Sequence, residues 1–123
     1  MPELRKLLFI DNDEAFIKVI EKLSKSIGLD NLSTAFFSKD EKLEIPEGIE
    51  IILCTDLRPA GSHVEDFHWK SVYELIEPEQ TFVLYSSLGP AIDVARKLGV
   101  AVVPREDPIK DLLVIMEQYC FLP

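Results

Sequence analysis

The chain has 123 residues, of which 47% are apolar, and its formal net charge is −9. This length fits one core, so we expect a single domain over residues 1–123. The acidic balance argues against nucleic-acid binding, which needs clustered lysine and arginine. The apolar stretch behind Arg5 and Lys6 lasts four residues, too short for a signal peptide, and no run reaches membrane-spanning length. We therefore expect a cytoplasmic protein with no membrane partner.

Short apolar runs alternate along the chain with segments of helical apolar spacing. In the first half, we expect strands over residues 4–10, 32–37 and 49–54, with helices from Glu14 to Gly28 and over Lys39–Leu43. In the second half, we expect a turn at Pro59–Gly61, a helix from Val64 to Ile76, strands over 81–85 and 100–103, and helices from Pro90 to Gly99 and from Pro108 to Cys120.

Five strands that alternate with helices predict the α/β class, a (βα)5 doubly wound parallel sheet. Right-handed crossovers favour the flavodoxin-like strand order 2-1-3-4-5. The first and fifth helices are then expected on one face of the sheet, and the second to fourth helices on the other.

Acidic residues follow two of the predicted strands. The run Leu7–Ile10 stops at Asp11, Asn12 and Asp13, and the run from Ile51 to Thr55 stops at Asp56. In a parallel sheet, the carboxyl ends of the strands line one common crevice. Like charges gathered there are costly unless a cation lies among them, and oxygen ligands favour Mg²⁺. The sequence therefore predicts a small acidic pocket that depends on a cation.

Further polar residues follow the last two strands: Ser86 and Ser87 after the fourth, Arg105 after the fifth. With Leu-Phe-Ile-Asp11-Asn12-Asp13-Glu14, Leu-Cys-Thr-Asp56 and Val-Leu-Tyr-Ser86-Ser87, the chain resembles the receiver (CheY-like) domain of bacterial two-component response regulators over essentially its whole length. Ser86 follows Asp56 by 30 residues, a separation typical of compact members of this family.

The resemblance implies a signalling switch in which Asp56 is the phosphoacceptor. It assigns the metal site to Asp11, Asn12 or Asp13, Asp56 and the backbone carbonyl of Arg58, with Mg²⁺ as the ion. Ser86, Ser87 and Arg105 are the groups expected to bind the phosphoryl oxygens. The implied partners are a histidine kinase or phosphotransfer protein upstream, and a target protein or effector domain downstream.

Several positions depart from the receiver pattern. Asn12 stands where the family has a second acid, Arg105 stands for the usual lysine, and Val102 lies near a switch position that is usually aromatic. These departures favour an alternative, a pseudo-receiver that binds other proteins without phosphorylation. A third hypothesis is a haloacid-dehalogenase-like phosphatase with Asp11 as nucleophile, although that family needs a larger fold with a cap. Asp13 is equally well explained as the cap of the first helix.

Overall fold

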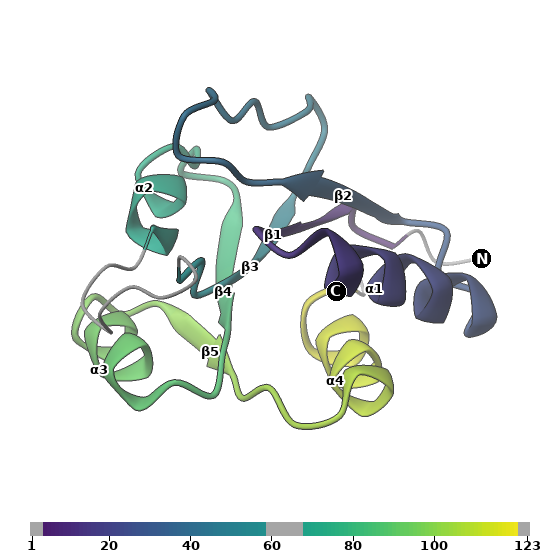
Figure 1. Cartoon of the computed structure of the whole chain (residues 1–123). Helices are drawn as coiled ribbons and strands as arrows, with labels where there is room; N and C mark the ends of the chain where they lie inside the picture. The colour runs from purple at the N-terminus through teal and green to yellow at the C-terminus, as the bar shows by residue number, and fades with distance from the viewer. Residues whose placement is uncertain (1–3, 59–67, 121–123) are drawn as a thin grey trace.

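A five-stranded parallel sheet with strand order β2-β1-β3-β4-β5 forms the centre of the structure (Figure 1). The computed structural model describes residues 4–58 and 68–120. The strands are β1 (Leu7–Asp11), β2 (Leu32–Phe36), β3 (Ile51–Thr55), β4 (Thr81–Tyr85) and β5 (Ala101–Val103). This order and the parallel direction confirm the α/β, flavodoxin-like sheet predicted from the sequence.

The central strands β1 and β3 are buried along their whole length, as expected of apolar strands covered on both faces. They pair in register, with Ile10 opposite Cys54, and β3 pairs with β4 so that Thr55 lies opposite Tyr85. The carboxyl ends of these three strands are therefore level. As a result, the residues that follow them leave the sheet from adjacent points.

Helices cover both faces of the sheet. On one face lie α1 (Glu14–Ser26) and α4 (Pro108–Ile115), which share a buried apolar cluster with β1 and β4 (Figure 1). On the other face lie α2 (Trp69–Tyr73) and α3 (Gly89–Lys97), whose buried side chains join a second cluster. The first and last helices thus share a face, as predicted. A π-helical turn (Met116–Cys120) follows α4.

The helix predicted over Lys39–Leu43 is wrong. The chain from β2 to β3 forms an irregular loop, which arches away from the sheet in Figure 1. Residues 39–43 carry one apolar side chain, Leu43, too few to stabilise a short helix by packing it on the sheet, and Pro46 prevents its extension. The loop still contributes Phe37, Leu43, Ile45 and Ile49 to the apolar cluster beside α2 and α3. The described residues therefore hold four α-helices rather than the predicted five.

Other element boundaries differ by a few residues. The first strand begins at Leu7 rather than at residue 4. In the predicted helix from Val64 to Ile76, the described part is helical over Trp69–Tyr73; Val64 and the predicted turn at Pro59–Gly61 lie outside the described residues. Within 4–58 and 68–120, no helix combines the length and apolar character needed to cross a membrane.

Candidate functional site

A hollow of about 770 Å³ lies at the carboxyl edge of the sheet. Its lining includes six of the residues singled out from the sequence: Asp11, Asn12, Asp13, Asp56, Arg58 and Arg105. These residues come from the ends of β1, β3 and β5, which the parallel sheet brings to one edge. The fold therefore places the predicted acids and the predicted cationic side chain, Arg105, around one hollow.

Asp11 ends β1 and is 3% exposed. Its Oδ1 accepts hydrogen bonds from the Thr55 hydroxyl at 2.7 Å and from the Asn12 backbone N–H at 2.8 Å. Burial raises the pKa of Asp11, and the bonds from Thr55 and Asn12 counter part of that rise. The buried Oδ2 has no hydrogen-bond partner among the described residues. Asp11 therefore presents one fixed oxygen to the protein and leaves the other for a ligand.

Asn12 joins the first loop to the residues after β3. Its side-chain Nδ2 donates to the backbone carbonyl of Arg58 at 3.1 Å. The next residue, Asp13, caps α1: its Oδ1 accepts from the N–H groups of Ala15 and Phe16 at 3.0 and 3.3 Å. The Asn12 side chain therefore connects two loops, and the Asp13 side chain caps the start of a helix.

Asp56 is half-buried directly after β3, and its Oδ1 accepts a hydrogen bond from the Ser86 hydroxyl at 3.0 Å. Ser86 is 1% exposed, and its Oγ also accepts from the Leu88 N–H at 3.0 Å. The residue after Asp56, Leu57, has a φ of +54° although its side chain is buried. A left-handed conformation is costly for leucine, and such strain often marks functional sites. The backbone therefore turns sharply to hold Asp56 beside Ser86.

Arg105 and Ser87 meet through the loop after β5. The Arg105 guanidinium lies over the Phe16 ring, 3.8 Å from the ring centroid, which fixes the side chain by a cation–π contact. Its positive charge counters the rise in the pKa of Asp11, though less than the Thr55 and Asn12 bonds do. The Ser87 hydroxyl donates to the Arg105 carbonyl, so Ser87 holds this loop instead of joining Ser86 at Asp56.

Sequence reasoning missed a second pair of side chains that supports this loop. The buried Tyr85 hydroxyl donates to Asp111 Oδ2 at 2.6 Å, and the same oxygen accepts from the N–H groups of Glu106 and Asp107. Burial and this bond raise the pKa of Tyr85. A signal was present, since Asp111 lies four residues before the buried Ile115 and so on the inner face of α4. Thr55 was missed as well, although it is a polar residue at the end of a buried strand.

The groups at this edge of the sheet offer carboxylate and carbonyl oxygens, which are the ligands that a hard cation prefers. Asp11 and Asp56 supply carboxylates, and Arg58, whose carbonyl accepts from Asn12, lies in the same lining. Asp11 Oδ2 is buried without a partner among the described residues. Mg²⁺ is commonly held by one or two carboxylates and several waters. Within 4–58 and 68–120, no three or more His, Cys, Asp or Glu side chains converge on a point as in an all-protein metal centre. These residues therefore fit a partly hydrated Mg²⁺ rather than an enclosed metal.

Comparison with known structures supports the fold alone. The chain is similar to a de novo designed Rossmann 2x3 fold protein, with a TM-score of 0.65, 16% identity, and 97% and 94% of the two chains covered. It is also similar to adenylate cyclase from Rhodopirellula baltica, with a TM-score of 0.51, 16% identity and 93% of each chain covered. No family model matches the sequence, and no curated protein is detectably similar. The chain has a Rossmann-like, flavodoxin-like α/β fold.

Proposed function

We propose that this protein is a receiver that accepts a phosphoryl group on Asp56 and changes its interaction surface in response. The observation that carries the proposal is the 3.0 Å hydrogen bond from the Ser86 hydroxyl to Asp56 Oδ1. It joins the ends of two neighbouring strands beside the hollow that Asp56 lines together with Asp11 and Arg105. A carboxylate nucleophile beside a second acid, a hydroxyl and a cation is the set of groups that phosphoryl transfer to aspartate requires.

The residues of the chain have distinct parts in this reaction. Ser86 holds Asp56 Oδ1, so that the other oxygen, Oδ2, attacks phosphorus while the bond from phosphorus to the ring nitrogen of the donor histidine breaks and that nitrogen keeps the electron pair. The Ser86 hydroxyl and the Arg105 guanidinium then donate to the new phosphoryl oxygens. Asp11, Asp56 and the Arg58 carbonyl would hold Mg²⁺, which supplies charge neutralisation between the acids and the incoming phosphate.

The proposed partners follow from this chemistry. The phosphoryl donor is a histidine kinase or a phosphotransfer protein, and the output is a target protein or an effector domain. The loop after β5 is the route that we propose for the signal, because Ser87 and Asp111 both hold it by hydrogen bonds to its backbone. Movement of Ser86 toward a phosphoryl group acts directly on its two neighbours in the chain. Ser87 bonds to the loop, and Tyr85 bonds to Asp111, which holds the loop.

A second candidate, the pseudo-receiver, is favoured by one contact. The Asn12 amide donates to the Arg58 carbonyl, an oxygen that the receiver mechanism assigns to the metal. A carboxamide in this position bridges the two loops by itself, so the site keeps its shape without a cation. The phosphatase hypothesis has no comparable support, because Asp11 is 3% exposed and its Oδ1 already accepts two hydrogen bonds.

Acetyl phosphate with Mg²⁺ tests these candidates. We expect the intact protein to gain the mass of one phosphoryl group, to lose it in hydroxylamine as acyl phosphates do, and to gain nothing in Asp56→Asn. Asp11→Asn is the matched control, and it should still label at Asp56, more slowly. Label that survives Asp56→Asn and disappears in Asp11→Asn would favour the phosphatase. A wild-type protein that takes no label would favour the pseudo-receiver.

A further inference from the structure

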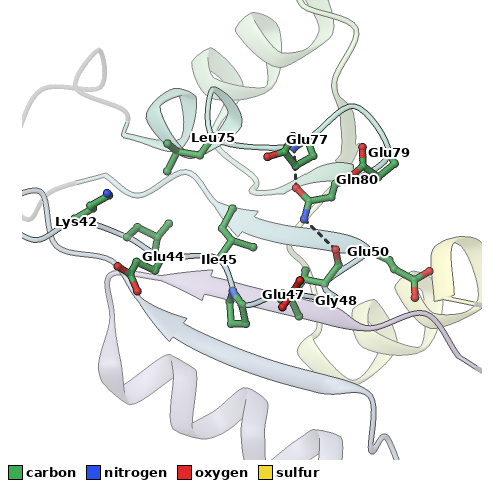
Figure 2. Close-up of a pocket in the computed structure, with 13 residues that line it drawn as sticks. Lys42, Glu44, Ile45, Glu47, Gly48, Glu50, Leu75, Glu77, Glu79 and Gln80 are labelled. Carbon is green, nitrogen blue, oxygen red and sulfur yellow. Dashed lines mark hydrogen bonds between the residues drawn. The ribbon is translucent and has the colours of Figure 1, made fainter.

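A second hollow, of about 720 Å³, lies at the amino edge of the sheet, opposite the acidic site. It opens between the β2–β3 loop, which forms no helix, and the segment that follows α2. Its apolar lining includes Leu43, Ile45, Ile49 and Leu75. Figure 2 shows Leu75 and Glu77 on one wall and the loop with Glu44 and Ile45 on the other.

The two walls of this hollow are tied together by Gln80. Its Nε2 donates to the Ile49 carbonyl at 2.9 Å, and its Oε1 accepts from the Glu77 N–H at 2.8 Å, as the dashed lines in Figure 2 mark. A backbone bond from the Thr81 N–H to the Glu50 carbonyl, 2.9 Å, adds to this connection. The hollow is therefore a preformed feature, so a ligand does not have to order its walls.

The apolar surface continues beyond this hollow. A neighbouring hollow of about 450 Å³ shares Lys42, Leu43 and Leu75 with it and reaches Phe37 and His68. The shared residues place the two hollows next to each other along the β2–β3 loop, and together we call them the groove. Leu75, where they meet, is 51% exposed. An elongated groove with an exposed apolar side chain at its centre suits a segment of polypeptide better than a small ligand.

The rim of the larger hollow is strongly acidic. Lys42 lines it and the Lys6 ammonium lies beside Gly48, against five exposed glutamates, Glu44, Glu47, Glu50, Glu77 and Glu79. Among the described residues, Glu50 alone of the five has an ion-pair partner, Arg5 at 4.0 Å. The glutamates outnumber these lysines, so the rim keeps a net negative charge that a cationic partner would offset. Because the whole chain carries a net charge of −9, a second copy of it is a poor candidate for that partner.

We infer that this groove binds a basic amphipathic segment of a partner protein, which places apolar side chains on Leu43, Ile45 and Leu75 and lysine or arginine side chains against the glutamate rim. Charge complementarity selects a basic partner. The apolar floor selects a segment that also carries hydrophobic side chains, which a simple polyamine lacks. The larger hollow, which carries the glutamates, lies at the amino edge of the sheet, so this binding does not require phosphoryl transfer at Asp56.

The test is an amide chemical-shift titration with a capped amphipathic peptide of leucine and lysine, about four helical turns long. We expect saturable shifts over residues 42–50 and 75–80, with binding that weakens as salt is raised. Glu47→Lys with Glu79→Lys should weaken binding at least about tenfold. The matched control, Asp93→Lys with Glu117→Lys, makes the same change in net charge at exposed positions elsewhere and should stay within about threefold.

A third variant tests the apolar floor without endangering the core. Leu75→Ser removes a half-exposed side chain and should weaken peptide binding by about threefold or more. The inference is overturned if the peptide gives no saturable shifts, if both double variants lose affinity equally, or if Leu75→Ser binds as the wild type does. Equal binding of spermine, or of a peptide with glutamate in place of lysine, would overturn it as well.

Discussion

The two edges of the same sheet carry hollows of similar volume, about 770 and 720 Å³, that are built in opposite ways. At the carboxyl edge, side chains from different elements bond to one another: Thr55 to Asp11 and Ser86 to Asp56 between strand ends, and Tyr85 to Asp111 between a strand and α4. At the amino edge, the glutamates are exposed, and the walls are joined through Gln80 to backbone groups.

This difference shows what each edge is suited to do. Bond-making chemistry needs groups held to within a fraction of an ångström, which buried, cross-bonded side chains provide. Docking of a partner needs an accessible apolar surface with a charged rim, and it tolerates mobile side chains. The contrast predicts that substitutions at the carboxyl edge affect stability and metal affinity, while substitutions at the amino edge affect binding alone.

The largest effect is expected from Asp111→Ala. This change leaves the Tyr85 hydroxyl and the N–H groups of Glu106 and Asp107 without their acceptor, so the free energy of unfolding should fall by about 3 kcal/mol. Urea denaturation measures it. Glu79→Ala at the amino edge is the control and should stay within about 0.5 kcal/mol of the wild type. Equal losses for the two variants would remove the distinction between the edges.

A smaller effect is expected from Asn12→Asp. The new carboxylate faces the Arg58 carbonyl oxygen, to which the amide now donates, so the metal-free protein should be less stable. The added charge should tighten Mg²⁺ binding about tenfold, or about 1.4 kcal/mol. Amide shifts during Mg²⁺ titration and thermal melts in chelator measure the two changes. Asp13→Asn, which keeps the helix cap, is the control; unchanged affinity in Asn12→Asp would place Asn12 outside a metal site.

The smallest effect concerns the pH dependence of stability. Burial raises the pKa of Asp11 above its ordinary value of 3.8, so the folded state holds this proton more tightly than the unfolded state does. The stabilisation that comes from this tighter proton binding is complete below pH 3.8 and is lost as the pH rises through the raised pKa of Asp11. In chelator, the stability of Asp11→Asn relative to wild type should therefore increase from about pH 3 to about pH 7.

Urea denaturation across this pH range measures the difference. Glu79→Gln, an exposed carboxylate at the amino edge, is the control. A pH dependence as large for Glu79→Gln as for Asp11→Asn would mean that burial of Asp11 has no special effect on stability.

The sequence predicted the sheet and the meeting of the acids because both depend on local patterns. Runs such as Ile51–Thr55 are apolar on both faces, which fixes a buried parallel strand, and the parallel direction then brings Asp11 and Asp56 to one edge. The helix expected over Lys39–Leu43 failed because Leu43, the one apolar residue of this segment, belongs to a loop that packs on the core. A single apolar residue defines no helical face.

Hydrogen-bond partners within the site could not be predicted in the same way. Ser86 and Ser87 are adjacent, yet one bonds to Asp56 and the other to the Arg105 carbonyl, because consecutive side chains at the end of a strand point in different directions. The bond from Asn12 to the Arg58 carbonyl joins residues 46 positions apart and depends on how two loops approach each other. Such contacts are properties of the tertiary structure.

The most direct test of the central claim is an amide chemical-shift titration with beryllofluoride, which occupies a phosphoacceptor aspartate as an analogue of the phosphoryl group. With Mg²⁺ present, we expect new resonances for Asp56, Ser86 and the loop around Arg105, and none of these changes in Asp56→Asn. Shifts that are absent from the wild type, or that persist unchanged in Asp56→Asn, would contradict the assignment of Asp56 as phosphoacceptor.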